Sequence, residues 1–244
     1  MEPWSPEWKA QRIFELHQQW GGCEACLLSE TRNSLVYGYG NADADIVLVG
    51  EGPGEEEDHE GVPFVGASGQ LLRAMLEALK VDPNDLFITN LVMCRPPNNR
   101  EPTRAERVAC LPRLHEELYI VDPILVIAVG KQAFAALTRI GDSMESSRGE
   151  LFKMTIPGKA KFGNDFVPLE YDVMPIYHPA FILRADSIDP KTKKWHADGP
   201  AEKTVDDLER ALKLVNMVKM QYSNVQKEAR RKYNAKDLPK RTRR

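Results

Sequence analysis

The sequence lacks any hydrophobic run long enough to cross a membrane. Its longest apolar stretch covers residues 124–129, whereas a transmembrane helix needs about 20 consecutive apolar residues. The first residues, Met-Glu-Pro-Trp-Ser, contain neither the basic start nor the apolar segment of a secretory signal. We therefore expect a cytoplasmic protein without a membrane partner.

Signs of wholesale disorder, internal repeats or a second core are also missing. Hydrophobic residues make up 42% of the 244 residues and charged residues 28%, which is ordinary usage for a globular protein. A chain of this length can form one large domain or two small ones. Because no internal linker interrupts the pattern, we expect one domain over residues 1–220, and a monomer.

Charge is nearly balanced but unevenly distributed. The chain has 33 Lys or Arg and 36 Asp or Glu, yet residues 221–244 contain nine basic and two acidic residues. The body of the chain is therefore acidic, and this tail is basic and has no apolar periodicity. Such a tail favours a flexible segment that binds an anionic partner such as nucleic acid. The alternative is a solvated tail that only aids solubility.

Cysteine is scarce, and its four copies are arranged in an informative way. Cys23 and Cys26 form a C-x2-C pair, and Cys94 and Cys110 follow far downstream. Disulfides are rare in a reducing cytosol, whereas a C-x2-C turn places two thiolates on one metal centre. The spacing predicts a four-cysteine site for zinc or an iron–sulfur cluster. Buried, chemically inert cysteines are the alternative.

Apolar runs alternate with amphipathic stretches along the chain. Strand-like runs cover residues 46–49, 86–89, 124–129 and 173–176, and helix-like stretches cover 5–20, 69–79, 103–119, 131–138 and 204–219. Strands separated by helices predict an α/β fold with a mostly parallel four-stranded sheet, covered by helices on both faces. Residues 146–172 are compatible with a hairpin, and residues 186–200 with a polar loop.

The loops after the predicted strands hold most of the unusual residues. Ligands of open parallel sheets bind beyond the carboxyl ends of the strands, which selects residues 50–58, 90–99, 130 onward and 177–184. Residues 50–58 read Gly-Glu-Gly-Pro-Gly-Glu-Glu-Glu-Asp. Five carboxylates would repel a phosphate, so this loop suits a site where positive charge develops. A solvated acidic turn is the alternative.

Two polar residues stand directly after predicted strands. Asn90 presents donors and an acceptor suited to reading a base edge. His178, which precedes Pro179, is placed to hydrogen-bond a developing anion. Each residue alone is more often structural, but their convergence on one sheet edge favours a catalytic site.

These motifs together resemble the family 4 uracil-DNA glycosylases. The resemblance rests on residues 49–58, 61–66, 69–72 and 89–100, and on His178-Pro179-Ala180 followed by Leu183 and Arg184. It covers roughly residues 23–215, and the cysteine spacing is also similar to that of the family. The resemblance implies a DNA repair enzyme that hydrolyses the bond between uracil and deoxyribose in single- or double-stranded DNA.

The resemblance also implies roles for individual residues. Phe64 would stack on a uracil flipped out of the DNA, and Asn90 would read its edge. His178 would donate a hydrogen bond to uracil O2, assisted by backbone amides near Gly52. Glu57 would orient the attacking water and Glu51 would shape the pocket, with the reverse assignment as the alternative.

A 4Fe–4S cluster with a structural and DNA-contacting role is a further implication of the resemblance, its ligands being Cys23, Cys26, Cys94 and Cys110. Because no lysine stands out in the strand-end loops, we expect a monofunctional glycosylase that leaves the abasic site intact. Two other functions remain open. One is a catalytically silent iron–sulfur module that binds DNA during replication. The other is a zinc-stabilised protein that acts on a nucleotide.

Overall fold

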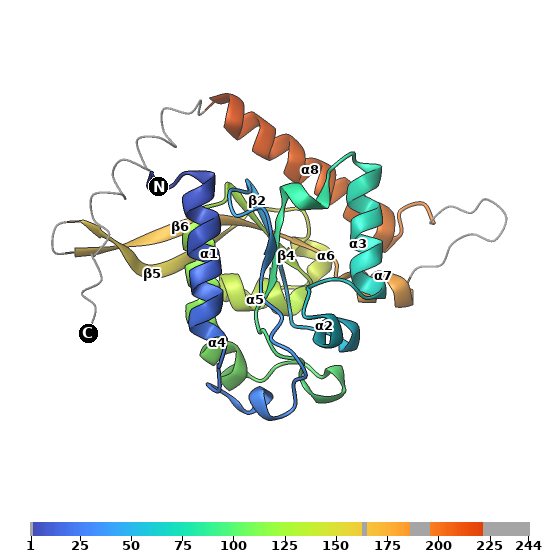
Figure 1. The fold of residues 1–244 in the computed structure, drawn as a ribbon. Coiled ribbons are helices and arrows are strands. Elements are labelled where there is room, and N and C mark those ends of the chain that lie inside the picture. The colour runs from blue at the N-terminus through green and yellow to red at the C-terminus, as the bar shows by residue number, and fades with distance from the viewer. Residues whose placement is uncertain (1, 163–164, 186–195, 222–244) are drawn as a thin grey trace, which may run out of the picture.

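The computed structural model describes residues 2–162, 165–185 and 196–221 and is built around one six-stranded sheet (Figure 1). The strand order is β1 (Tyr39–Gly40), β3 (Phe87–Asn90), β2 (Ile46–Gly50), β4 (Leu125–Val129), β6 (Asp165–Ile176) and β5 (Phe152–Phe162). The four inner strands run parallel, and β1 and β5 join the two edges antiparallel. The carboxyl ends of the inner strands therefore meet at one edge of the sheet.

Helices cover both faces of this sheet. One face packs against α1 (Pro6–Trp20), α4 (Arg104–Val121) and α5 (Lys131–Thr138), and the other against α3 (Ala67–Ala78), α7 (Pro179–Ala185) and α8 (Pro200–Gln221). Along β2, Val47 and Val49 face the first group and Leu48 faces the second. Because strands covered on both faces need apolar residues at every position, β2 and β4 read as continuous apolar runs.

Shorter helices occupy the connections. They are α2 (Glu55–Glu60), α6 (Met144–Ser147) and three 3-10 turns at Leu27–Glu30, Pro83–Asp85 and Pro97–Asn99. The longer helix α4 begins at a capping box, in which the Thr103 hydroxyl and the Glu106 carboxylate each accept a backbone N–H of the other. This reciprocal pair satisfies amide donors that a helix start otherwise leaves unbonded.

The structure confirms the predicted fold class and all four predicted strands. The sequence predicted four strands and the sheet has six, because β1 and β5 were not predicted. Strand β1 has only two residues. Strand β5 pairs with β6 as a hairpin, in agreement with the pattern of residues 146–172. The acidic loop contains α2, and the segment after His178 is helical. Residues 222–244 of the expected basic tail (221–244) and residues 186–195 of the expected polar loop (186–200) lie outside the described residues.

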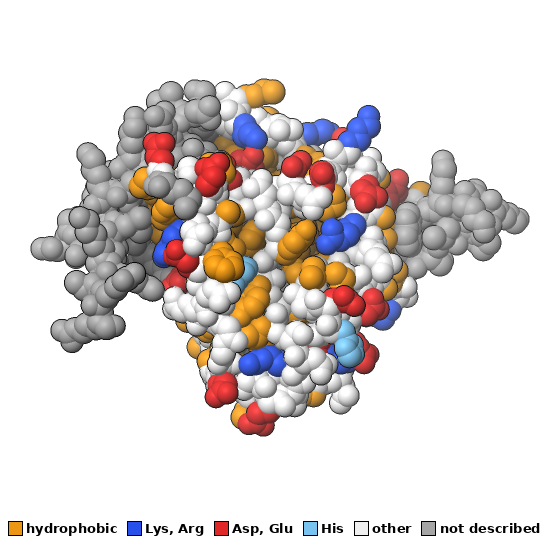
Figure 2. All heavy atoms as spheres, in the orientation of Figure 1, with side chains coloured by type: hydrophobic (Ala, Val, Ile, Leu, Met, Phe, Trp, Pro, Cys, Tyr) orange, Lys and Arg blue, Asp and Glu red, His pale blue; other side chains and the backbone are white. Residues whose placement is uncertain are grey.

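On the face shown in Figure 2, acidic and basic side chains are interspersed, and hydrophobic side chains gather toward the middle. No single sign of charge dominates that face. Among the described residues, no helix has the length and hydrophobicity required to cross a membrane.

Candidate active site

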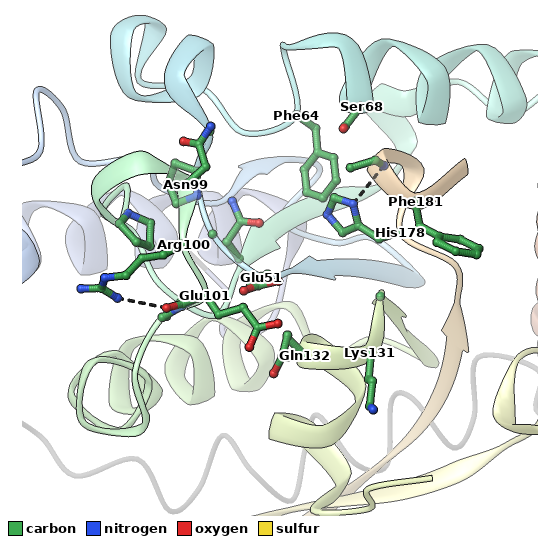
Figure 3. Close-up of a pocket in the computed structure, with 18 of the residues that line it drawn as sticks. Glu51, Phe64, Ser68, Asn99, Arg100, Glu101, Lys131, Gln132, His178 and Phe181 are labelled. Atoms are coloured by element: carbon green, nitrogen blue, oxygen red, sulfur yellow. Dashed lines mark hydrogen bonds between the residues drawn. The ribbon is translucent and has the colours of Figure 1, made fainter. Parts of the chain in front are cut away.

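A cavity of about 670 Å³ opens at the carboxyl ends of the inner strands (Figure 3). The loops after β2, β3, β4 and β6 all contribute to its walls. Every base-site and catalytic residue predicted from the sequence lines it: Glu51, Gly52, Glu57, Phe64, Asn90 and His178. The four cysteines do not line it. The structure therefore brings together residues that lie up to about half of the chain apart.

Asn90 stands at the end of β3 with its side chain close to the neighbouring strand. A Cβ atom on Gly50 would lie only 2.3 Å from Asn90 Oδ1 and 2.6 Å from the Phe64 ring. Only a glycine at position 50 allows the amide and the ring to approach this closely. The Asn90 side chain makes no hydrogen bond to the described residues, although it is only 4% exposed. Its amide group is therefore available to a ligand in the cavity.

Phe64 has a backbone conformation that a bulky residue rarely adopts. Its φ is +55°, in the left-handed region that is costly for residues with a Cβ. Its side chain is nevertheless buried, being 7% exposed, and lines the cavity. The surrounding structure thus holds the ring against a conformational cost, as is common for residues that contact ligands.

The His178 imidazole is held in one tautomer. Its Nδ1 accepts a hydrogen bond of 3.1 Å from the backbone N–H of Ala180, so the ring proton is on Nε2 when the imidazole is neutral. Burial, and then the nearby charge of Arg184, lower the pKa of His178 to about 4, against a smaller opposing effect of Glu57. The imidazole is also packed closely against the chain just after β4, because a Cβ on Gly130 would lie only 2.9 Å from His178 Cβ. His178 is therefore a neutral, fixed Nε2–H donor at neutral pH.

Glu51 is a half-buried carboxyl group without a hydrogen-bond partner among the described residues. Burial, followed by the negative charge of Glu101, raises its pKa to about 7, and Arg107 acts weakly in the opposite direction. Figure 3 shows Glu51 in the middle of the site and Glu101 beside the cavity. Such a carboxyl group can change its protonation state near neutral pH and can accept a hydrogen bond from water.

Glu57 is engaged by backbone on both sides. Its Oε2 accepts the N–H of Gly54 at 3.0 Å, and its Oε1 accepts the N–H of Gly66 at 2.8 Å. These bonds close the start of α2 and hold the chain that leads to α3. Because a carboxylate has about four lone-pair sites, Glu57 retains capacity to accept a further donor from the cavity.

Other residues of the cavity were not assigned a role from the sequence. They include Glu101, Lys131, Gln132 and Phe181. The expectation of a monofunctional enzyme assumed that no lysine lies near the pocket, whereas Lys131 lines it. Figure 3 shows the Lys131 side chain pointing away from His178. The signal that could have revealed Lys131 was its position in the loop after the predicted strand 124–129, one residue beyond Gly130.

Behind the cavity, a buried ion pair supports the end of β3. Arg113 of α4 is 0% exposed and Glu117, one turn later, is 1% exposed. Arg113 donates to the backbone carbonyl of Asn90 at 2.7 Å and to the Thr89 hydroxyl at 2.8 Å. Glu117 accepts from Thr89 at 2.8 Å. This network fixes the backbone that carries the Asn90 side chain.

The four cysteines gather at a second place, beside α4. Cys94 and Cys110 are buried in a small apolar cluster, and Cys23 and Cys26 pack against it. All four thiols are free. Burial is the main cause that raises the pKa of Cys94, to about 11, although Arg32 donates a hydrogen bond to its Sγ at 3.5 Å. A positive metal centre would stabilise such buried thiolates.

The chemistry of this donor set fits a thiolate-ligated group. Four free thiols in a largely apolar shell, with a guanidinium beside one of them, are the ligands that zinc or an iron–sulfur cluster requires. As positioned, no three or more His, Cys, Asp or Glu side chains of the described residues are arranged to hold a metal ion. The site thus has four donors of the right chemical type, gathered around one apolar cluster.

Comparison with known proteins gives the family. The model of the uracil DNA glycosylase superfamily matches residues 37–199, about two thirds of the chain. A type-4 uracil-DNA glycosylase of Pyrobaculum aerophilum is 38% identical over 176 residues, which are 72% of this chain and 87% of that protein. A type-4 uracil-DNA glycosylase of Saccharolobus solfataricus is 39% identical over 166 residues, 66% of this chain and 72% of that protein.

A more distant relative is a DNA polymerase of Bacillus phage SP01, 27% identical over 158 residues that form only 16% of the polymerase. The match to the superfamily model spans the strand ends and loops that form the cavity. Together with the type-4 relatives, it shows that the chain belongs to the uracil DNA glycosylase superfamily.

Proposed function

We propose that the cavity binds a uracil flipped out of DNA, and that the residues lining it catalyse hydrolysis of the bond between uracil N1 and the deoxyribose. As a member of its superfamily the chain is a uracil-DNA glycosylase, a DNA repair hydrolase that releases uracil and leaves an abasic site. The observation that carries the mechanism is the convergence of an aromatic ring, an unpaired amide, a neutral imidazole and an unpaired carboxyl group in one cavity.

Recognition of the base falls to Phe64 and Asn90. A uracil inside a duplex is unreachable, so it must leave the stack at a cost of a few kcal/mol. The Phe64 ring offers a flat surface for the flipped base, and the free Asn90 amide can pair with uracil O4 and N3. Cytosine reverses donor and acceptor at these atoms, so a fixed Asn90 leaves a buried polar group unpaired, which costs about 1–3 kcal/mol.

Departure of the base is assisted by His178. As the glycosidic bond lengthens, negative charge builds on uracil and positive charge on the sugar. The Nε2–H of His178 is proposed to donate to uracil O2, and backbone amides near Gly52 to assist. Because the imidazole is neutral and already oriented, this donor needs no reorganisation at the transition state.

The contacts favour Glu51 over Glu57 as the group that orients water, which is the reverse of the first assignment from the sequence. Glu57 already accepts two backbone amides, and so is suited to shaping the pocket. Glu51 lines the same cavity without a partner among the described residues. Its negative charge would also stabilise the cationic sugar.

We also propose that Cys23, Cys26, Cys94 and Cys110 hold a 4Fe–4S cluster, with zinc as the alternative. When bound, the cluster would supply a structural crosslink between α4 and the N-terminal segment, and no catalytic step depends on it.

All residues proposed for catalysis come from one chain, which supports action as a monomer. The presence of the complete catalytic set disfavours a catalytically silent DNA-binding module.

The test is an oligonucleotide with one uracil, incubated with the purified protein. We expect release of free uracil and a strand that breaks at that position only after alkali treatment. Borohydride should trap no covalent adduct, since Lys131 points away from His178. Strand breakage without alkali, accompanied by a trapped adduct, would contradict the monofunctional mechanism. Iron and zinc analysis of anaerobically purified protein decides between cluster and zinc.

A further inference from the structure

Helix α2 carries two consecutive carboxylates that bind different parts of the molecule. Glu57 binds the backbone of Gly54 and Gly66 at the cavity. Asp58 is 1% exposed and accepts the N–H of Asn33 at 3.0 and 3.1 Å, the Asn33 side-chain amide at 2.7 Å and the N–H of Ser34 at 3.2 Å. One short helix thus ties together two loops that are distant in sequence.

The loop held by Asp58 belongs to the four-cysteine site. Asn33 and Ser34 directly follow Arg32, whose guanidinium donates to Cys94 Sγ at 3.5 Å. Two residues after Ser34, the N–H of Val36 donates to the carbonyl of Met93 at 2.9 Å, next to Cys94. The backbone of residues 32–34 therefore joins two sets of hydrogen bonds, one to Cys94 and one to Asp58.

We propose that Asp58 is a positioning residue that couples the four-cysteine site to the base pocket. The inference rests on the proposed cluster and on the proposed role of the cavity. When the cysteines hold their metal group, the loop at residues 32–34 is fixed, Asp58 anchors α2 on that loop, and Glu57 holds the amides of Gly54 and Gly66 in place. Loosening of the loop at residues 32–34 therefore loosens the base pocket, and loosening of the pocket loosens the loop.

The length of α2 explains why the anchor matters. The helix has six residues, and isolated helices shorter than about 12–15 residues are marginal in water. Four acidic residues in its first turns leave it without an apolar face of its own. Its position therefore depends on contacts with other segments: those of Glu57 and Asp58, and an ion pair of 3.5 Å between Glu55 and Arg95.

Asp58→Asn tests the coupling, because it keeps the size of the side chain but replaces one acceptor oxygen with an amide donor. Glu60→Gln is the matched control: it makes the same chemical change on the same helix, at an exposed position. Amide hydrogen exchange of the 15N-labelled, metal-loaded proteins gives the readout. Local opening free energies determine these exchange rates. The N–H of Gly149, bonded to the carbonyl of Pro175 at 2.9 Å, serves as reference.

In the Asp58→Asn variant we expect amide exchange at Asn33 and Ser34 to accelerate at least about tenfold. Exchange at Gly54 and Gly66 should accelerate at least about threefold. Exchange at Gly149 should not change. Loss of the metal group to a chelator should accelerate about threefold or more. Single-turnover cleavage should slow about fivefold or more while DNA affinity changes less than about twofold, because a loosened pocket loses transition-state stabilisation. Glu60→Gln should match the wild type in every measurement.

If amide exchange accelerates at Asn33 and Ser34 but not at Gly54 and Gly66, Asp58 does not couple the two sites and the proposal is wrong. If Asp58→Asn does not fold, Asn33→Ala removes only one of the four hydrogen bonds and should show the same pattern at smaller amplitude. A wild-type protein that releases no uracil would contradict the proposed function instead. In that case the exchange pattern still decides whether Asp58 links the two sites.

Discussion

His178 accepts the backbone N–H of Ala180 through Nδ1, at 3.1 Å. His178 directly precedes α7 and Ala180 lies in its first turn, so the imidazole is oriented by the backbone of the helix that follows it. This bond places the ring proton on Nε2, the nitrogen left available to the cavity. The donor that the proposed mechanism requires is thus built from local structure.

Replacement of His178 should slow catalysis without weakening the fold. Loss of one preorganised donor typically costs about 10²–10³ in rate, and we expect His178→Ala to reduce single-turnover cleavage of uracil-DNA by at least about tenfold. Differential scanning fluorimetry should give a melting temperature close to that of the wild type. An unchanged rate in a folded variant would remove His178 from the mechanism.

Activity should depend on the ionisation of Glu51. Its pKa is raised to about 7, mainly by burial and then by Glu101, and only the ionised form orients water and stabilises the sugar cation. As the pH falls below the pKa of Glu51, kcat/KM should fall by about tenfold per unit, because this parameter reports the free enzyme. His178 adds no step in this range, since its pKa is about 4.

Two variants test whether Glu51 causes the fall of kcat/KM at low pH. Glu101→Gln should move the midpoint of this fall to lower pH, because removal of a nearby negative charge lowers the pKa of Glu51. Glu57→Gln should leave its midpoint in place, although we expect a reduced rate from the loosened pocket. A wild-type profile that stays flat down to about pH 5 would contradict the assignment of Glu51.

Asn90→Asp should weaken the preference for uracil over cytosine. The substitution removes the side-chain donor and leaves two acceptors that face uracil O4 unfavourably. Cleavage of matched oligonucleotides with uracil or cytosine at one position measures the ratio. If discrimination is unchanged, another group reads the base edge.

The buried pair behind Asn90 should matter for stability as well as activity. Arg113→Met leaves Glu117 buried without its cationic partner, which we expect to destabilise the protein by about 3–5 kcal/mol. Because an apolar pair of similar volume avoids the unpaired charge, the double variant Arg113→Met, Glu117→Leu should recover part of this loss. Urea unfolding of the three proteins measures it. Equal stability of wild type and single variant would contradict the role of the pair.

The sheet and its functional edge could be predicted because parallel strands buried on both faces leave a clear pattern. The strands at 46–49 and 124–129 are continuous apolar runs, so their order along the chain is enough to place the functional loops directly after them. The resemblance then supplied roles for Phe64, Asn90 and His178, all of which line one cavity.

Other features could not be predicted because tertiary contacts create them. Helix α2 has no apolar periodicity, and its stability comes from hydrogen bonds to residues 33–34, 54 and 66. Arg113 looks like an ordinary surface residue in the middle of a helix, and only the folded chain brings it to Asn90, 23 residues earlier. The pKa of Glu51 likewise depends on burial and on Glu101, which the sequence does not reveal.

The most direct test of the central claim is the quantity of free uracil released under single-turnover conditions by the wild type and by Glu51→Gln. Mass spectrometry of the products from a duplex with one uracil gives this quantity. We predict one uracil per duplex from the wild type, and a rate at least about a hundredfold lower for the folded variant, as expected when transition-state charge stabilisation is lost. The absence of uracil release by the wild type, or an equal rate for both proteins, would contradict the account.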